Sequence, residues 1–427
     1  MKYTIATLGC KVNQFETQAM ETMLAERGWH STKDGDADVI IVNTCAVTAE
    51  SGRKSRQTVR RLKSENPRAL VAVCGCFSQI SPDEMEALDA DLIYGSGDRR
   101  QLVEDIHRVM ESREKVRHID DPFRRRIFEC LPAGAMEGRT RAYIKIQDGC
   151  DNFCTYCVIP YARGRVRSMP AAEAASQAEQ LAREGFAEIV VTGIEIASYG
   201  KDLRDGSDLV EVVCAVADAA PEVRIRLGSI EPTVITERFC RELAKRENIC
   251  PHFHLSLQSG CDASLQRMKR KYDTARFYEA VCLLREFFPD CALTADLITG
   301  FPGESEEDHE ETLAFLRRCA FSSMHVFPYS QRPGTKAAAM PGQLSRAVKE
   351  RRAKQAQQLA DEMEIAYLQS CVGKTLSVLF ETQHEGGWRG HAANYCEVWA
   401  PGDLEHGIVR SVQITEQKGK KLIGFCI

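Results

Sequence analysis

The chain has 427 residues, of which 44% are hydrophobic and 27% charged, the balance of an ordinary globular protein with room for two or three domains. Its net charge of −5 gives no general attraction to nucleic acid, and it carries no secretory signal or run of membrane-spanning length. We therefore expect a cytoplasmic protein with no membrane or DNA partner. In that compartment its 18 cysteines are expected to be metal ligands and core thiols and not disulfides.

Residues 1–125 alternate short apolar runs with amphipathic segments. This alternation predicts an α/β domain, a doubly wound parallel sheet with helices on its faces. Strands are expected at Tyr3–Leu8, Asp38–Asn43, Leu70–Val73 and Asp91–Tyr94, and helices at Phe15–Arg27, Val47–Lys63, Pro82–Leu88 and Arg99–Ser112.

Three of these strands are each followed within a few residues by a cysteine: Cys10, Cys45 and Cys76. The carboxyl ends of parallel strands line one crevice, so the three thiols should meet there, and adjacent glycines would let the backbone approach a bulky inorganic group. Each could instead be a small core residue, which is the role we assign to Cys74. Their equivalent positions favour a three-cysteine cluster site.

Residues 126–138 mix proline, glycine and charge, which indicates a linker. Six strand–helix pairs follow within residues 139–367 and predict an open (β/α)6 barrel with its active site at the carboxyl ends of the strands. The strands are expected at Ala142–Gln147, Glu188–Thr192, Arg224–Ser229, His252–Leu257, Leu293–Thr299 and Met324–Pro328.

The loop after the first barrel strand reads Cys150-Asp-Asn-Phe-Cys154-Thr-Tyr-Cys157. Three closely spaced thiolates can hold three irons of a four-iron cluster and leave the fourth iron open. Half of a structural zinc site would need a fourth ligand nearby, and three unrelated core thiols are rare at this density. The spacing resembles the signature of radical S-adenosylmethionine (SAM) enzymes, in which the open iron binds SAM.

Further candidates for SAM contacts follow the other barrel strands, although such residues are also common in ordinary loops. A carboxylate there could receive the ammonium group of SAM. These candidates are Gly193, Glu195, Glu231, Gln258, Gly300 and Tyr329. His252 and His254 alternate along a strand and are expected to be core or hydrogen-bonded residues.

Residues 368–427 contain five short strand-like runs with glycine and asparagine turns, which predict a small all-β barrel, a pattern that the oligonucleotide-binding type would fit. Local basic groups suit phosphate recognition, but acids balance the cations of the barrel, and solvated faces explain the charges equally well. The candidate RNA contacts are Arg163, Arg165, Arg167, Lys418, Lys420 and Lys421.

The order of motifs resembles the radical-SAM methylthiotransferases over essentially the whole chain. The motifs are Thr7-Leu-Gly-Cys-Lys-Val-Asn13, Val42-Asn-Thr-Cys45, Gly75-Cys76, the three-cysteine loop, Gly300-Phe-Pro-Gly-Glu304 and the terminal barrel. The resemblance implies an auxiliary [4Fe-4S] cluster on Cys10, Cys45 and Cys76 and a radical-SAM [4Fe-4S] cluster on Cys150, Cys154 and Cys157. It also implies a C-terminal TRAM domain that recognises the substrate.

Three branches of this family differ in substrate. The motifs Leu8-Gly-Cys-Lys-Val-Asn13 and Leu257-Gln-Ser-Gly-Cys-Asp262 look most like those of the branch that acts on N6-threonylcarbamoyladenosine-37 of tRNA. The isopentenyladenosine-37 branch tends to Gly-Cys-Gln-Met-Asn, and the branch acting on an aspartate of ribosomal protein S12 to Gly-Cys-Pro-Lys-Asn.

The implied reaction places a methylthio group on C2 of the adenosine in the tRNA anticodon loop. SAM would serve as both methyl donor and radical source. A radical is expected because no side chain is basic enough to deprotonate such a carbon. An external electron donor, such as a flavodoxin or ferredoxin system, is the other expected partner. The alternative of another class is a non-catalytic metal-cluster scaffold that binds RNA.

Overall fold

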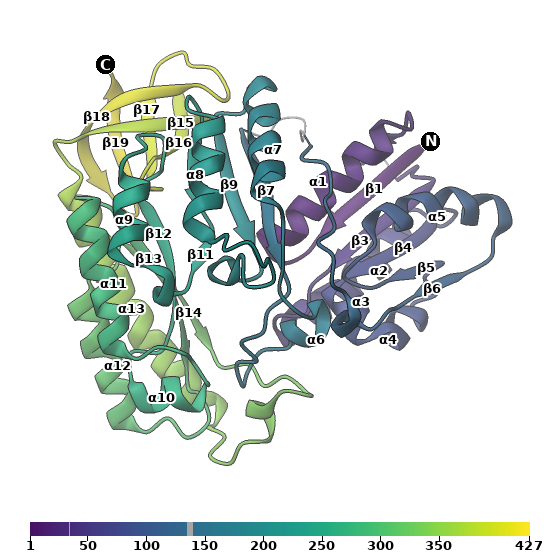
Figure 1. Cartoon of the computed structure of the whole chain (residues 1–427), viewed down its shortest axis with the longest axis horizontal. Coiled ribbons are helices and arrows are strands. Elements are labelled where there is room, and N and C mark those ends of the chain that lie inside the picture. The colour runs from purple at the N-terminus through teal and green to yellow at the C-terminus, as the bar shows by residue number, and fades with distance from the viewer. Residues whose placement is uncertain (34, 135–139) are drawn as a thin grey trace.

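A computed structural model describes residues 1–33, 35–134 and 140–427. Residues 135–138 of the expected linker lie outside these ranges. The described chain forms an N-terminal sheet covered by helices, a central open barrel, and a small β-barrel at the C-terminus (Figure 1). The fold class expected from the sequence is confirmed.

The first sheet is parallel throughout and has the strand order β2-β1-β3-β4-β5-β6. Helices α1 and α5 cover one face through a core that includes Phe15 and Leu102, and α2 to α4 cover the other around Val59 and Met85. The sheet is therefore doubly wound, as expected. Its elements are β1 (Lys2–Thr7), α1 (Lys11–Ala25), β2 (His30–Ser31), β3 (Val39–Thr44), α2 (Ala49–Glu65), β4 (Leu70–Gly75), α3 (Cys76–Ile80), α4 (Pro82–Glu86), β5 (Leu92–Tyr94), α5 (Arg99–Ser112) and β6 (Val116–His118).

Strands β1, β3 and β4 are neighbours in this sheet, so the loops after them meet at one edge. Two glycines in these loops have positive φ angles, +103° at Gly9 and +102° at Gly75. A Cβ on Gly9 would lie 2.8 Å from the Cys45 sulfur, and one on Gly75 would lie 2.4 Å from the Thr44 carbonyl oxygen. Glycine is therefore required at both turns.

The central barrel consists of two four-stranded sheets, β10-β9-β7-β8 and β11-β12-β13-β14. The expected third strand is split between them, with β10 ending at Leu227 and β11 beginning at Ser229. The strands are β7 (Arg141–Asp148), β8 (Arg167–Ser168), β9 (Glu188–Gly193), β10 (Arg224–Leu227), β11 (Ser229–Ile230), β12 (His252–Gln258), β13 (Ala292–Thr299) and β14 (Ser323–Pro328).

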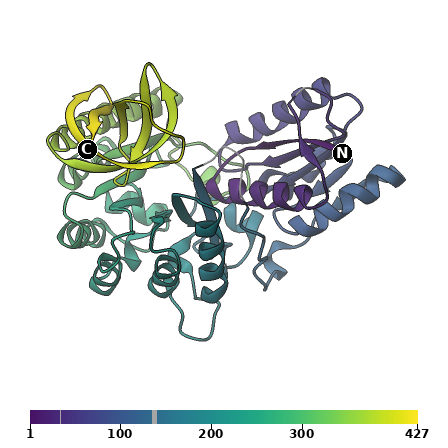
Figure 2. The same ribbon diagram turned by 90° about the horizontal axis from the view of Figure 1, so that it is seen from above.

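The helices of this barrel lie outside the strands (Figure 2), and several of them start at a residue whose side chain caps the helix. The Asp208, Asp273 and Ser305 side chains each accept a backbone N–H from the first turn of the helix that follows, which satisfies an otherwise free donor. The helices are α6 (Ile159–Arg163), α7 (Ala171–Arg183), α8 (Leu209–Ala219), α9 (Glu237–Ala244), α10 (Asp262–Arg267), α11 (Thr274–Phe287), α12 (Glu306–Cys319) and α13 (Arg346–Ser370). Short 3-10 turns occupy Pro122–Arg124, Ile196–Ser198, Pro232–Val234 and Lys336–Ala339.

The C-terminal barrel is closed, with the strand order β15-β16-β17-β19-β18. Its strands are β15 (Thr375–His384), β16 (Gly387–Ala392), β17 (Glu397–Pro401), β18 (Val409–Lys418) and β19 (Lys421–Cys426). It is anchored at the start of β10, where Arg224 donates to the Ser377 hydroxyl at 2.7 Å and Arg226 to the Ala393 carbonyl at 2.9 Å. Helix α13 leads into it and runs three residues past the boundary expected at 367/368.

A buried group of charges joins α1 of the first sheet to the first strand and loop of the central barrel. The Glu16 carboxylate binds Arg99 at 3.0 Å, Lys145 at 3.4 Å and Arg163, and each of these four side chains is at most 1% exposed. Burial opposes ionisation of Glu16, yet Arg163, Arg99 and Lys145 hold its pKa down at about 2.

None of the helices in the described ranges has the length and apolar character that a membrane span needs.

Glu16→Gln should destabilise the protein strongly, because three buried cations would lose their shared carboxylate. We expect the free energy of unfolding of the apo protein, measured by urea titration, to fall by about 3 kcal/mol. The matched control is Glu65→Gln, which breaks the exposed pair with Arg61 at 2.9 Å and should leave stability nearly unchanged. Equal effects of the two substitutions would contradict this account.

Candidate active site

A cavity of about 970 Å³ lies where the N-terminal sheet, the central barrel and the C-terminal barrel meet. Four of the six candidate ligand cysteines line it: Cys10, Cys150, Cys154 and Cys157. Its other walls come from all three parts of the fold. They include Gly9, Lys11, Gly193, Glu195, His252, His254, Gln258, Arg270, Asp296, His391, Tyr395 and Lys420.

The Cys150–Cys157 loop directs hydrogen-bond donors at its own sulfurs. The Asn152 N–H lies 3.5 Å from the Cys150 sulfur and the Ile159 N–H 3.4 Å from the Cys157 sulfur. The Arg270 guanidinium donates to the Cys154 sulfur at 3.1 Å. Donors and a positive charge at these positions stabilise thiolate ligands and an anionic cluster.

The second cysteine group lies at the edge of the first sheet. Cys45 and Cys76 are buried, whereas Cys10 is exposed at the cavity. The Arg163 Nε donates to the Cys76 sulfur at 3.2 Å, while its terminal nitrogens bind Glu16 and the Asn13 amide oxygen, the latter at 2.8 Å. The barrel therefore supplies the cation that faces this edge of the sheet.

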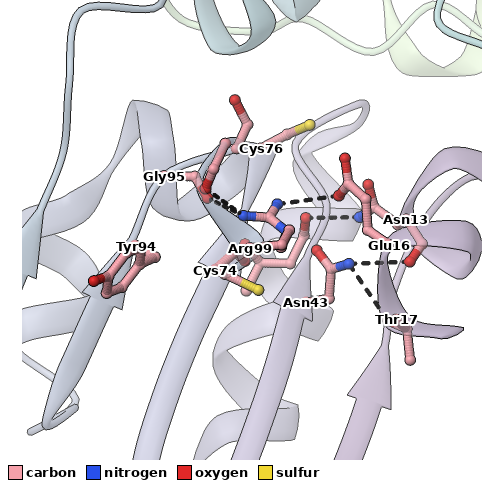
Figure 3. Close-up of polar contacts among 12 residues, drawn as sticks. Asn13, Glu16, Thr17, Asn43, Cys74, Cys76, Tyr94, Gly95 and Arg99 are labelled. Atoms are coloured by element: carbon pink, nitrogen blue, oxygen red, sulfur yellow. Dashed lines mark hydrogen bonds and ion pairs between the residues drawn. The ribbon is translucent and has the colours of Figure 1, made fainter. Parts of the chain in front are cut away.

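Hydrogen bonds and ion pairs connect the residues behind these cysteines (Figure 3). Figure 3 shows the Arg99 guanidinium between the Gly95 carbonyl, 3.0 Å away, and the Glu16 carboxylate. It also shows the Asn43 amide donating to the Asn13 carbonyl at 3.0 Å, which ties β3 to α1. Cys74 points into the apolar core of the sheet, as expected, rather than into the cavity.

Each cysteine group offers three thiols, the ligand type that an iron–sulfur cluster takes. Among the residues that the structure describes, no three His, Cys, Asp or Glu side chains come together at the spacing that one metal ion needs. A four-iron cluster is larger and takes one thiolate per iron. Burial raises the pKa of Cys150 and of Cys157 to about 12, so these thiols hold their protons until a metal displaces them.

Three of the candidate SAM contacts, Gly193, Glu195 and Gln258, line the cavity. One Glu195 oxygen is shut off from solvent and makes no hydrogen bond with any described residue. Burial and the nearby charge of Glu231 raise the pKa of Glu195 to about 7. Glu231 is not among the residues that line the cavity; it is buried and bound to Arg270 at 2.9 Å.

Gly300 and Tyr329 are not among the residues that line the cavity. The Gly300 N–H donates to Glu304, which is buried and bound to Arg352 at 2.7 Å. Tyr329 is buried against Phe301. The loop after β13 folds back onto α13 and holds both residues away from the cavity wall, so their role as SAM contacts stays a prediction.

The prediction that Arg163 and Arg167 contact RNA is wrong, because both side chains are buried. Arg163 binds Glu16 and Asp148, and Arg167 donates to the carbonyl of Arg165 at 2.7 Å. Arg165 remains exposed beside Asp151.

The three lysines proposed for RNA binding differ in exposure. Lys418 is exposed and Lys421 is half-buried. Lys420 is exposed, but it is bound to Asp361 and Glu364 of α13 at 2.6 and 2.7 Å.

Sequence reasoning missed several cavity residues. Arg270 lies in the basic run Arg267-Met-Lys-Arg-Lys271, a pattern equally typical of solvated charges. His252 and His254 both hydrogen-bond to the Thr294 hydroxyl, at 3.2 and 2.9 Å, as expected, yet they also line the cavity. Lys11 and Tyr395 come from the other two parts of the fold, and only their packing against the barrel brings them here.

Comparison with known proteins identifies the family. Residues 144–316 match the model of the radical SAM superfamily, and residues 2–95 match the uncharacterized protein family UPF0004. The threonylcarbamoyladenosine tRNA methylthiotransferase MtaB of Bacillus subtilis (strain 168) is 38% identical over 400 residues, which is 92% of this chain and 88% of the relative. The chain belongs to the radical-SAM methylthiotransferase family.

Other members of this family match over a similar length. MtaB of Thermotoga maritima is 37% identical, with 88% of this chain and 86% of the relative covered. The tRNA-2-methylthio-N(6)-dimethylallyladenosine synthase of Pelotomaculum thermopropionicum is 33% identical, with 90% and 88% covered. A radical-SAM methylthiotransferase is an enzyme, so the non-catalytic scaffold considered above is set aside.

Solved structures share the fold at low sequence identity. The radical S-adenosylmethionine methyltransferase TsrM from Kitasatospora setae superposes with a TM-score of 0.58 at 15% identity, covering 79% of this chain and 77% of that one. The cobalamin-dependent S-adenosylmethionine radical enzyme OxsB gives 0.52 at 12% identity, covering 84% and 56%. The pairing of an N-terminal sheet with a radical-SAM barrel thus has precedent in solved structures.

The raised pKa of Glu195 predicts a pH-dependent stability. Between its ordinary pKa of 4.5 and about 7, the unfolded chain ionises this carboxyl while the folded apo protein keeps it protonated. The stabilisation is therefore present at low pH and is lost as the pH rises through 7. Relative to Glu195→Gln, wild type should lose about 2 kcal/mol of unfolding free energy between pH 5 and pH 7.5. Parallel pH profiles of the two proteins would contradict the assignment.

Proposed function

We propose that this enzyme adds a methylthio group to C2 of N6-threonylcarbamoyladenosine at position 37 of tRNA. One observation carries the proposal: cysteines of two separate groups, Cys10 from the first sheet and Cys150, Cys154 and Cys157 from the barrel, line the same cavity. A radical generated at one group and a sulfur donated from the other can then act on one substrate carbon. The relatives named MtaB support the choice of nucleoside.

Two [4Fe-4S] clusters and SAM are the cofactors of the proposal. Cys150, Cys154 and Cys157 would hold one cluster, and Cys10, Cys45 and Cys76 the other; when bound, the clusters supply the electron for SAM cleavage and the sulfur for transfer. We assign the auxiliary site to residues 1–125, the radical chemistry to residues 139–367 and RNA recognition to residues 368–427. Exposed Arg165 and Lys418 remain candidate RNA contacts, with Lys421 at the barrel surface.

The side chains of the cavity have distinct tasks in this proposal. The unpartnered oxygen of Glu195 accepts a hydrogen bond from the ammonium group of SAM. The positive charge of that group would lower the pKa of Glu195 and favour its ionised form. Arg270 offsets negative charge at Cys154, and Arg163 does the same at Cys76. Gly193 and Gln258 border the same region, and the surrounding walls keep water from the radical.

The partners of the proposal are tRNA, through its anticodon loop, and an external one-electron donor such as a flavodoxin or ferredoxin system. The enzyme would act in the cytoplasm, where its tRNA substrate and a reducing thiol environment are found.

The substrate assignment is tested by nucleoside mass spectrometry of tRNA from a deletion strain. We expect 2-methylthio-N6-threonylcarbamoyladenosine to disappear and its unthiolated precursor to accumulate, with both reversed by the wild-type gene. Loss of 2-methylthio-isopentenyladenosine instead would favour the second candidate, because relatives with that substrate are 33–34% identical. An unchanged tRNA profile with altered ribosomal protein S12 would favour the ribosomal branch.

Cysteine variants test the two-site assignment. Anaerobically reconstituted wild type should hold about eight irons per chain. Cys45→Ala should keep about four irons and still cleave SAM with dithionite, yet transfer no methylthio group, whereas Cys150→Ala should keep about four irons and lose SAM cleavage. Cys74→Ala is the matched control, because Cys74 packs in the core, and it should retain all the iron. Equal iron loss in Cys74→Ala and Cys45→Ala would contradict the assignment of Cys45 as a cluster ligand.

A further inference from the structure

Lys11 stands out among the positively charged side chains of the cavity. Among the described residues, the other lysine and arginine side chains that line it are those of Arg270 and Lys420. Both are bound to carboxylates, Arg270 to Glu231 and Lys420 to Asp361. Within the same described ranges, no carboxylate lies within salt-bridge distance of Lys11 and its side chain makes no hydrogen bond. It therefore presents a free ammonium group to the cavity.

The surrounding charges do not neutralise this group. Burial lowers the pKa of Lys11, and Arg226 and Arg141 lower it further, whereas Glu188 and Asp296 raise it. An anion bound beside the Lys11 ammonium group would offset the effect of burial. Lys11 is also the first residue of α1, and the Cys10 side chain makes no capping hydrogen bond there. The positive end of the helix dipole adds to the same local preference for an anion.

The chemistry of the substrate supplies a matching anion. The threonylcarbamoyl group ends in a carboxylate, whereas an isopentenyl group is apolar. On the adenine ring, N6 and C2 lie on either side of N1, so the N6 substituent and the reacting carbon share one edge of the base. Cys10 lines the cavity beside Lys11, and hence a base that presents C2 to the Cys10 side brings its N6 substituent within the reach of a lysine side chain.

We propose that Lys11 binds the carboxylate of the N6 amino-acid substituent and thereby selects this nucleoside over one with an apolar N6 group. The inference rests on the proposed function and deepens it. An apolar substituent would cover the ammonium group without pairing it, which is unfavourable, so the same lysine both attracts one substrate and rejects the other. Asp296, held by His254 at 3.2 Å across the cavity, offers an acceptor for the N–H or hydroxyl of the same substituent.

The test compares two anticodon stem-loop RNAs that differ only in charge. One carries N6-threonylcarbamoyladenosine at position 37, and in the other the threonine carboxylate is replaced by its primary amide. Dissociation constants are measured anaerobically with the full-length, iron-loaded protein without reductant, so binding is read separately from turnover. Wild type should bind the acid at least about tenfold more tightly than the amide, the usual worth of a charge-assisted hydrogen bond.

Substitutions locate the effect. Lys11→Met should bring the acid-to-amide ratio of dissociation constants close to one, and Lys11→Arg should retain most of the preference. Lys420→Met is the matched control: it removes a lysine from the same cavity, but one already bound to acids, so the ratio should stay at the wild-type value. A wild-type ratio in Lys11→Met would overturn the inference.

The outcome is separable from that of the proposed function. If wild type methylthiolates the acid and amide RNAs equally well and binds them equally, the role of Lys11 is wrong while the reaction stands. If wild type modifies an isopentenyladenosine stem-loop and neither of these two, the substrate assignment itself fails. If Lys11→Met loses iron, Lys11→Gln takes its place, because it also removes the charge but keeps a polar side chain; a wild-type acid-to-amide ratio in Lys11→Gln would equally overturn the inference.

Discussion

The guanidinium of Arg163 is the contact on which the arrangement of the site depends. It donates to the Cys76 sulfur, the Asn13 amide oxygen and the Glu16 carboxylate, and so contacts helices α1 and α3 of the N-terminal part from within the barrel. Arg163 ends α6, a five-residue helix that starts two residues after Cys157. One short, rigid segment therefore sets the spacing between the two cysteine groups. A buried cation without these acceptors would be costly, which makes the spacing hard to change.

The positions of the cysteines could be predicted from the sequence because they depend on topology alone. Once β1, β3 and β4 are recognised as parallel strands, Cys10, Cys45 and Cys76 must come to the same edge of the sheet. The two short edge strands, β2 and β6, have two and three residues and carry no periodic signal that a window could detect. The split of the third barrel strand at Gly228 likewise depends on how two sheets curve, which local sequence does not encode.

Where the structure departs from these expectations, the physical cause is a partner distant in sequence. A run of basic residues has the same sequence pattern whether its side chains are solvated or buried. The carboxylate that pairs with buried Arg163 belongs to Glu16, which lies 147 positions away in the sequence. Gly300 follows a strand end as a site residue would, but Glu304 beside it is turned inward by Arg352, 48 positions later. Lys11 and Tyr395 were missed for the converse reason, since each reaches the cavity only when separate parts of the fold pack together.

The shared carboxylate of Glu16 has a consequence for biosynthesis. When a ribosome has released the first sheet, Glu16 can already bind Arg99, but Lys145 and Arg163 have not yet been made. The edge that carries Cys10, Cys45 and Cys76 then has no cation facing Cys76. The nascent sheet can therefore form its apolar layers early, while the edge that would receive metal matures only after the first barrel loop has emerged. Insertion of an auxiliary cluster would accordingly be a late event, coupled to synthesis of the part of the chain that uses it.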